Sequence, residues 1–243
     1  MSDKLLDFFD EIYCINLDNR VDRWNSAQEA FKKLGIDDKV KRFSAIECRS
    51  NLSRQKIAKD YYNIELHGKL FSRKFPIHGA VGCATSHIEI LKIAKSKDLK
   101  NVLVFEDDIK ILDDYDKNSL LVLNELQNFS KPWELLYLGW EYDGKPRKTK
   151  KSLSKSNRGY KKFGLRTTRA IAYNKSVFDK IIKSNPFNSK TYGRGGHIDF
   201  FYRRNTFGRI FTRPALFGVH KNSIGLGDID LLKKLNKRDK NGK

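Results

Sequence analysis

The chain has 243 residues, of which 39% are hydrophobic and 12% aromatic, so it is too rich in apolar side chains to be disordered. This length allows one α/β domain or two. No apolar run approaches the roughly 20 residues that span a bilayer, and the N-terminus carries acids where a secretory signal carries basic residues. We therefore expect a soluble protein, cytoplasmic or peripheral on the cytoplasmic side of a membrane, that is not secreted by its own signal.

The net charge of +20 is concentrated in two segments. Residues 145–162 hold nine Lys or Arg and no acid, and residues 231–243 hold six with one acid, which together give +14. Such runs are typical of solvated loops and tails that attract anionic partners without specifying one. Either an adaptation for solubility or attraction to an anionic substrate or surface explains these two basic segments. We expect residues 1–230 to form a single domain and residues 231–243 a flexible basic tail.

The three cysteines, Cys14, Cys48 and Cys83, show no CxxC spacing. An odd number without that spacing argues against a disulfide framework or a zinc ribbon. We expect all three to be reduced and to behave as small buried hydrophobic residues.

Apolar runs alternate with helical periodicity along the chain. Residues 11–18 are β-rich and end at turn-forming residues, which predicts a buried strand, and the helical spacing that follows ends at Gly35. Further elements are expected in this order: a strand at 39–46, a helix and loop within 51–75, a glycine-rich start and helix at 79–97, a strand at 102–108, a helix at 117–129, a strand at 133–140, a strand at 169–174, a helix at 175–184 and a strand at 208–220. This alternation predicts an α/β fold with a mainly parallel central sheet flanked by helices.

Three consecutive acids, Glu106, Asp107 and Asp108, end the strand predicted at 102–108. Ligands of open α/β sheets gather at the carboxyl ends of strands, and adjacent carboxylates repel one another unless solvent or a cation compensates them. Mg²⁺ or Mn²⁺ suits such oxygens and bridges them to phosphates. Alternation along the strand end predicts that Glu106 and Asp108 point one way and Asp107 the other. A turn with a helix cap is the plain alternative.

Three motifs then occur in order: "YCINLDNRVDRW" at 13–24, "GAVGCATSH" at 79–87 and "VLVFEDD" at 102–108. In order and spacing they resemble glycosyltransferase family 25, the group of lipooligosaccharide and collagen galactosyltransferases. The segments "GLRTTRAIAYNKSVFDKII" and "GHIDFFY" resemble later parts of that family, so the likeness covers roughly residues 10–230. It implies a GT-A-like nucleotide-diphospho-sugar transferase fold and inverting transfer of galactose or a related hexose from a UDP-sugar, assisted by Mn²⁺ or Mg²⁺.

The resemblance also implies roles for the acid triplet, as the counterpart of a DxD motif. Asp108 is the first candidate for a metal ligand, and Glu106 for contact with the metal, its bound water or the ribose, with Asp107 beside them in the donor site. The departing UDP gains negative charge on its β-phosphate, which a divalent ion would stabilise.

Other candidates contact the donor. Asn16, Arg20 and Arg23 follow the first strand, and an arginine pair suits a diphosphate, although a capped helix with solvated arginines is the alternative. Ser86 and His87 lie in the small-residue segment, where glycines let a backbone approach a ligand closely, although a lone histidine is more often structural.

Two later residues complete the predicted site. Asp199, after two glycines, is the candidate base for the acceptor hydroxyl, and an aspartate bonded to turn amides is the alternative. His220 is a candidate metal ligand because a C-terminal histidine often completes the metal shell in related GT-A enzymes. Family 25 members commonly have a glutamine near this place and a Ser-Asp-Ile run after it, whereas "HKNSIGLGDI" stands here, so a phosphate contact or a surface position stays open.

Two functions from different classes remain. The first is a metal-dependent transferase whose acceptor is a glycan, a glycolipid or a hydroxylysine-containing protein. The second is an inactive transferase-like module that uses its positive charge to bind nucleic acid or an anionic surface. The second is disfavoured because no helix-turn-helix, zinc-finger or RNA-recognition signature occurs, so we expect no specific nucleic-acid partner. The acceptor, the donor hexose and the oligomeric state are not fixed by the sequence.

Overall fold

The computed structural model describes residues 4–67, 76–130, 132–142, 152–155 and 165–219. The helical elements are η1 (Leu6–Phe8), α1 (Val21–Leu34), α2 (Asn51–Tyr62), α4 (His78–Ser96), α5 (Tyr115–Gln127), α6 (Lys175–Ile182), α7 (Ser189–Tyr192) and α8 (Ile198–Asn205). The strands are β1 (Glu11–Asn16), β2 (Val40–Ser44), β3 (Asn101–Glu106), β4 (Ile109–Ile111), β5 (Leu135–Tyr142), β6 (Leu153–Lys155), β7 (Leu165–Asn174), β8 (Arg209–Thr212) and β9 (Phe217–Val219). No helix in these ranges is long and apolar enough to cross a membrane.

The described strands form one sheet in the order β2-β1-β3-β7-β5-β8-β6, and β9 joins β4 to β5 at its side. Strands β2, β1 and β3 are parallel, as expected for strands joined through helices. Strand β7 enters antiparallel between β3 and β5. The α/β sheet with flanking helices is confirmed, but the sheet is mixed rather than mainly parallel, because β7 returns beside β5 in the opposite direction.

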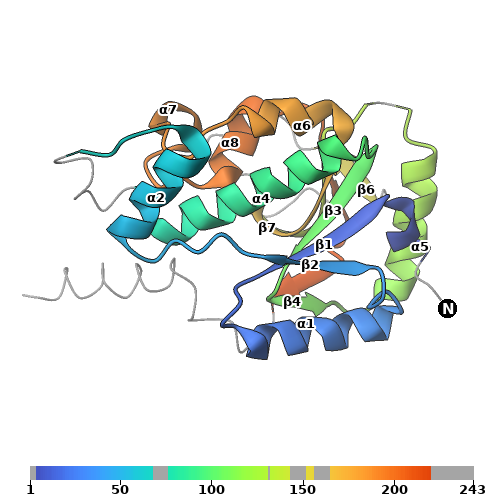
Figure 1. Cartoon of the computed structure of the whole chain (residues 1–243). Coiled ribbons are helices and arrows are strands. Elements are labelled where there is room, and N and C mark those ends of the chain that lie inside the picture. The colour runs from blue at the N-terminus through green and yellow to red at the C-terminus, as the bar shows by residue number, and fades with distance from the viewer. Residues whose placement is uncertain (1–3, 68–75, 131, 143–151, 156–164, 220–243) are drawn as a thin grey trace, which may run out of the picture.

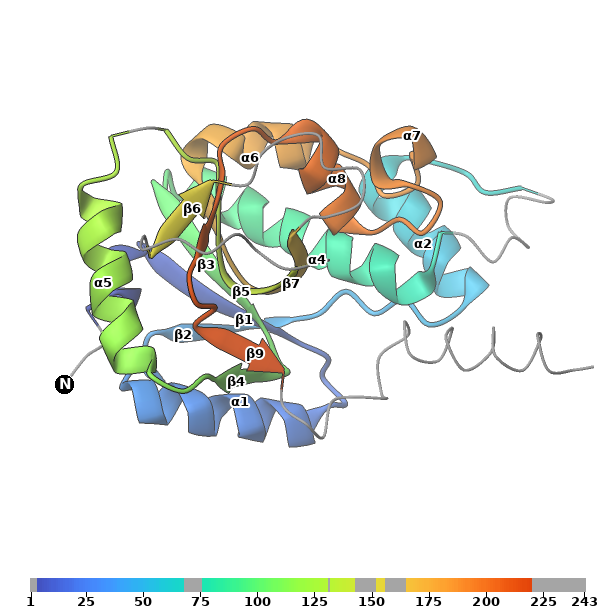
Figure 2. The same ribbon diagram turned by 180° about the vertical axis from the view of Figure 1, so that it is seen from behind.

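Helices cover the sheet on both faces, which gives three layers (Figures 1 and 2). Alternate residues of the central strand β3 divide between the two cores: Leu103 and Phe105 join the core under α1 and α5, and Val102 and Val104 join the core under α4, α6 and α8. Because β3 is covered on both faces, every residue from 101 to 105 is buried. Packing on both faces therefore fixes the position of Glu106, the last residue of β3.

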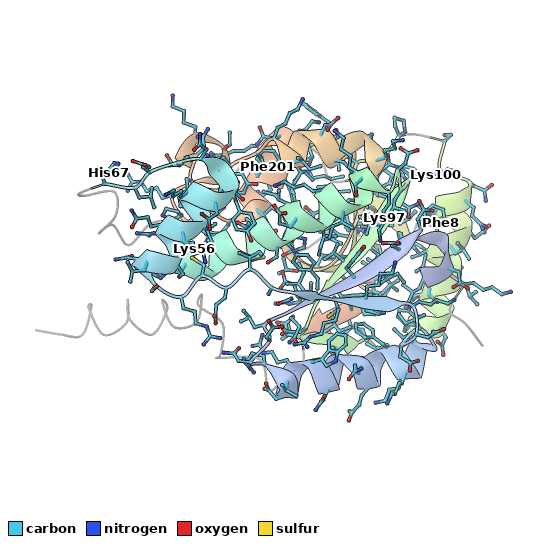
Figure 3. The ribbon with its side chains drawn as sticks, viewed as in Figure 1. Phe8, Lys56, His67, Lys97, Lys100 and Phe201 are labelled. Atoms are coloured by element: carbon cyan, nitrogen blue, oxygen red, sulfur yellow. The ribbon has the colours of Figure 1, made fainter. Side chains whose placement is uncertain are left out.

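An ion pair lies at the end of the sheet where β1 and β3 begin, opposite the end that carries the acid triplet. Lys97, just after α4, donates to Glu11 at the start of β1 across 3.0 Å. The labelled side chains of Phe8, Lys97 and Lys100 gather at this edge (Figure 3), which is where β1 and β3 begin. The acid triplet follows the other end of β3, so these lysines do not contribute to its surroundings.

Most expected elements are present, with differences in the second half. The strand predicted at 208–220 is two short strands, β8 and β9, with a cis peptide bond at Arg213-Pro214 between them. A proline has no amide to donate to a strand ladder, which explains why the strand is interrupted there. The sequence indicated neither of the short strands β4 and β6, which are too short to show periodicity, nor the helices α7 and α8. Gly35 ends α1 with φ of 65°, a conformation that glycine adopts freely.

Small residues in α4 allow this helix to pack closely against the segment that follows β2. The segment 79–87 lies wholly inside this helix, and a β-carbon on Gly82 would overlap the carbonyl oxygen of Ile46. Gly82 thus admits the neighbouring backbone, and the expectation that glycines in this segment let a ligand approach stays a prediction.

This contact predicts the effect of Gly82→Ala. Although alanine favours helices, the overlap forces α4 away from Ile46 and should lower the free energy of unfolding by about 1–3 kcal/mol, measured by urea denaturation. Lys92→Ala on the exposed face of the same helix is the matched control and should change it by about 0.5 kcal/mol or less. A Gly82→Ala protein as stable as the parent would show that α4 can move away from Ile46 without loss of free energy of unfolding.

Candidate functional site

Strand register brings three chain segments together at one edge of the sheet. Ile15 of β1 pairs with Glu106 of β3, and Phe105 pairs with Ala170 of the antiparallel β7. The last residue of β1, the acid triplet and the first residues of β7 therefore lie side by side. Strand β3 ends at Glu106, and Asp107 and Asp108 form the turn into β4. In Figures 1 and 2 this turn lies where β3 meets β4, beside β9.

Glu106 points toward α4. Its Oε1 accepts a hydrogen bond from the Thr168 hydroxyl, lies 3.7 Å from the sulfur of Cys83 and lies 3.9 Å from Nε2 of His87. Burial favours the neutral acid, but His87, Thr168 and the Arg169 guanidinium outweigh it and lower the pKa of Glu106. Glu106 is therefore an anion that keeps 29% of its side chain exposed at the site.

Asp107 points the opposite way, toward α1. Its two oxygens accept from Asn16 Nδ2 at 2.7 Å and from Arg23 Nη1 at 3.1 Å. Asn16 is buried, and its own oxygen accepts from Arg42 at 2.6 and 3.0 Å. Burial raises the pKa of Asp107 despite these partners, and the charge of Glu106 adds to the effect. The network fixes Asp107 within the structure, and the opposite directions of Glu106 and Asp107 agree with the alternation expected at a strand end.

Asp108 lies between these two networks with an unsatisfied oxygen. Its Oδ1 is buried and has no hydrogen-bond partner among the described residues. Burial, followed by the charge of Glu106, raises the pKa of Asp108 to about 6, although Arg169 and Arg23 act against it. We expected Asp108 to point the same way as Glu106 because side chains alternate along a strand. Strand β3 ends at Glu106, however, and Asp108 belongs to the turn that follows, so this alternation does not apply to it.

Asp199 lies in the first turn of α8, a helix that packs against β7. Its Oδ2 accepts from the backbone amide of Thr167 at 3.1 Å. Thr167 has φ of 80°, which is rare for a β-branched residue and indicates local strain. The charge of Asp199, after burial and the charge of Glu106, contributes to the raised pKa of Cys83, so Asp199 and Glu106 act on the same thiol.

The remaining predicted residues differ in placement. Arg23 reaches the acid triplet, whereas Arg20 forms an exposed bidentate pair with Asp22 at 2.7 and 2.9 Å. Ser86 is buried, accepts from the Ile46 amide and donates to the Gly82 carbonyl, so its hydroxyl bonds the chain after β2 to α4. His220 lies outside the described residues, as do the tail 231–243 and most of the segment 145–162.

Sequence reasoning missed three residues that act on the triplet, Cys83, Thr168 and Arg169, and a fourth, Arg42, that bonds to Asn16 beside it. Cys83 and His87 stand four residues apart, which is one turn of a helix, and that spacing was an available signal. Nothing local marks Thr168 or Arg169, because the antiparallel pairing of β7 with β3 brings them to Glu106 from more than 60 residues away.

The residues present fit a divalent cation. A buried carboxylate oxygen without a partner and a carboxyl pKa raised by a neighbouring anion are both relieved by positive charge. Oxygen ligands from Asp108 and Glu106 suit Mn²⁺ or Mg²⁺. The donor set therefore supports the metal expected there.

The raised pKa makes a prediction about stability against pH. Because the pKa of Asp108 is about 6 in the folded protein and 3.8 ordinarily, folding favours its protonated form. That stability is full below pH 3.8 and is lost as pH rises through 6. In metal-free buffer, Asp108→Asn should therefore raise the melting temperature relative to the parent at pH 7.5 and not at pH 4, by an amount corresponding to about 1–3 kcal/mol.

Asp113→Asn, in the exposed segment after β4, is the control for the general loss of one negative charge. Thermal melts of the three proteins across this pH range measure the effect. If the melting temperature of Asp108→Asn differs from that of the parent by the same amount at pH 4 and pH 7.5, a raised pKa of Asp108 is contradicted.

Known proteins resemble this chain over much of its length. The family model described as glycosyltransferase family 25 (LPS biosynthesis protein) matches residues 9–190. A procollagen galactosyltransferase 2 of Mus musculus is 28% identical over 135 residues, and a probable inactive glycosyltransferase 25 family member 3 of Bos taurus is 27% identical over 131 residues. Each alignment covers 54% of this chain and 21% or 22% of the relative, so the chain spans about a fifth of these relatives.

A solved structure also resembles the fold. The mannose-1-phosphate geranyltransferase of Thermus thermophilus aligns with a TM-score of 0.42 and 11% identity over 83% of this chain and 72% of that chain. This likeness is too distant to inform the site. The family match covers the first strand, the α4 segment, the acid triplet and strand β7. The chain belongs to glycosyltransferase family 25.

Proposed function

We propose that the protein is an inverting glycosyltransferase that moves a hexose, galactose first, from a UDP-sugar to an acceptor hydroxyl with the help of Mn²⁺ or Mg²⁺. The acceptor would belong to a glycan, a glycolipid or a hydroxylysine-containing protein. The observation that carries the proposal is the unsatisfied Asp108 oxygen beside ionised Glu106 at the end of the central strand. Family membership supports the transferase class.

The metal would be held by Asp108 and Glu106. When bound, it would stabilise the charge that develops on the β-phosphate of the leaving UDP. The chain's own contribution is to keep both carboxyl groups fixed in the absence of donor. Thr168 orients Glu106, and the turn into β4 fixes Asp108 between β3 and the strand pair β4–β9.

The donor nucleotide would bind where β1 passes into α1. Arg23 holds Asp107 through Nη1, and its buried Nε has no hydrogen-bond partner among the described residues. A guanidinium with an open donor beside the acid triplet suits a phosphate or ribose oxygen. Asn16 supports this function indirectly, because it bonds to Asp107 and Arg42 and so positions them.

Asp199 would serve as the base. An inverting transfer needs one group that takes the proton of the acceptor hydroxyl while that oxygen attacks the sugar carbon. The Thr167 amide orients the Asp199 carboxylate, and Asp199 acts electrostatically on Cys83 from the side of α8. The acids thus approach the site from different layers: the triplet from β3 and Asp199 from α8.

The second function is an inactive transferase-like module that binds an anionic partner through its basic segments. A specific observation keeps it in view: relatives from Bos taurus and Rattus norvegicus are named probable inactive family members. The buried oxygen of Asp108 favours the enzyme, because a module without metal or donor gains nothing from an acid whose ionisation costs free energy. Release of UDP from a panel of UDP-sugars separates the two.

The metal role predicts the behaviour of Asp108→Asn. With Mn²⁺ and a UDP-hexose, the parent should release UDP, and the variant should do so about 100-fold more slowly or worse. Mn²⁺ with donor should also raise the melting temperature of the parent and not that of the variant. Asp113→Asn is the control and should match the parent. Unchanged UDP release by a folded Asp108→Asn protein would remove the triplet from the reaction.

The base role predicts a different result for Asp199→Asn. Because the amide still accepts from Thr167 but takes no proton, transfer to an acceptor should fall by about 100-fold or more, while the thermal shift with Mn²⁺ and UDP persists. Glu125→Gln, which removes another acid that accepts backbone hydrogen bonds, is the matched control and should retain transfer. Equal loss of donor binding and transfer in Asp199→Asn would place Asp199 in donor binding instead.

A further inference from the structure

Cys83, His87 and Glu106 place three different ligand atoms around one point. The sulfur, Nε2 and a carboxylate oxygen all lie within 4.8 Å of one another. Two of these residues come from successive turns of α4 and the third from the end of β3. This cluster includes the carboxylate assigned above to the transferase site, but its sulfur and nitrogen atoms have no task in the proposed transfer.

His87 supplies the strongest evidence for a ligand. The ring is fully buried, and Nε2 has no hydrogen-bond partner among the described residues. Its distance from Glu106 Oε1 is 3.9 Å, which is too long for a hydrogen bond. A buried ring nitrogen without a partner costs free energy, so an atom that fills the space between Nε2, the sulfur and the carboxylate would relieve it.

The other side of the ring contacts a pair of tyrosine hydroxyl groups. Nδ1 lies 2.8 Å from the hydroxyl of Tyr173, which in turn lies 2.7 Å from the hydroxyl of Tyr202. In the metal-bound form, Nδ1 would donate to Tyr173 and Tyr173 to Tyr202, which places the lone pair of His87 on Nε2, facing Cys83 and Glu106. Metal-binding histidines in proteins use this arrangement, in which a buried partner holds the second ring nitrogen.

The distances fit a small tetrahedral ion. Zinc bonds of about 2.0–2.3 Å to nitrogen, oxygen and sulfur place neighbouring ligand atoms roughly 3.3–3.7 Å apart. Oε1 of Glu106 lies 3.7 Å from the sulfur and 3.9 Å from Nε2, close to this range, and the sulfur and Nε2 lie within 4.8 Å of each other. Sulfur and imidazole ligands favour zinc-class ions over Mn²⁺ or Mg²⁺.

We propose that Cys83, His87 and Glu106 bind a zinc-class divalent cation, with the fourth position open to the transferase site. The bound form needs the thiolate, so binding releases the thiol proton of Cys83 to solvent. An ion held here occupies the oxygen of Glu106 that Thr168 now contacts. Zinc-class ions would therefore compete with the Mn²⁺ or Mg²⁺ arrangement at the triplet.

Cobalt titration of the metal-free protein, without nucleotide or acceptor, tests the site. One equivalent of Co²⁺ should give a thiolate-to-cobalt charge-transfer band together with the visible bands of a tetrahedral ion, and Zn²⁺ should abolish both. Cys83→Ser should lose the charge-transfer band. Tyr173→Phe, which removes the hydroxyl that contacts both Nδ1 and Tyr202, should keep the band and weaken cobalt binding by about 10–100-fold.

Cys48→Ser is the matched control, because Cys48 is a buried cysteine in a separate small core with Ile57 and Val81. It should bind cobalt like the parent, and far-ultraviolet circular dichroism should show that each variant is folded. The proposal is overturned if the parent gives no thiolate band or if folded Cys83→Ser retains it. Because no donor is present, this outcome is independent of whether the protein transfers a sugar.

Discussion

Mutual repulsion among Glu106, Asp107 and Asp108 is the interaction on which the site depends. Three consecutive carboxyl groups at the end of a buried strand would destabilise the fold if all were ionised without compensation. The structure divides them among different surroundings: α4 and β7 stabilise the charge of Glu106, and α1 with β1 holds Asp107. Asp108 is left with a raised pKa and an oxygen without a partner among the described residues. Ionisation of Asp108 in the metal-free state therefore costs free energy, and positive charge beside it would offset this cost.

The mixed sheet is what makes this division possible. Parallel strands β1 and β3 end at the same edge, so Asn16 arrives beside Asp107. The antiparallel β7 begins at that edge, and so brings Thr168 and Arg169 to the acids from the other side. In an all-parallel sheet, the neighbour of β3 would end there as well. Both side chains would then lie at the distant end of their strand.

The sequence predicted the elements that have strong periodicity or a clear end. Strand β1, helix α1 with Gly35, and the buried strand β3 followed that pattern, and the motif order indicated the family. The position of the triplet was therefore predictable. Its partners were not, because Thr168 and Arg169 reach it through the antiparallel pairing of β7 with β3, and Arg42 reaches its neighbour Asn16 through the pairing of β2 with β1. Ser86 shows the converse: it stands in a family motif, yet its hydroxyl bonds to the backbone.

The short strands show another limit. Strands β4 and β9 have three residues each, too few for an alternating pattern, and they pair with each other after the turn at Asp107 and Asp108. Helix α8 was missed for a related reason. Two glycines precede it, which favours a turn, while its aromatic side chains Phe201 and Tyr202 pack into the core under α4. Tertiary packing thus decided the structure around Asp199.

The backbone at Thr167 connects α8 with the end of β3, because Thr167 bonds to Asp199 and the next residue bonds to Glu106. Its left-handed conformation costs about 1–3 kcal/mol for a residue of this type, and the Asp199 carboxylate holds its amide in place. The next residue, Thr168, holds Glu106. If Asp199 turns toward another partner, the Thr167 amide loses its acceptor and the backbone before Thr168 can relax, which moves the hydroxyl that Glu106 contacts. Asp199 and Glu106 are therefore connected through two consecutive residues, so the position of the Asp199 carboxylate bears on the hydroxyl that Glu106 contacts.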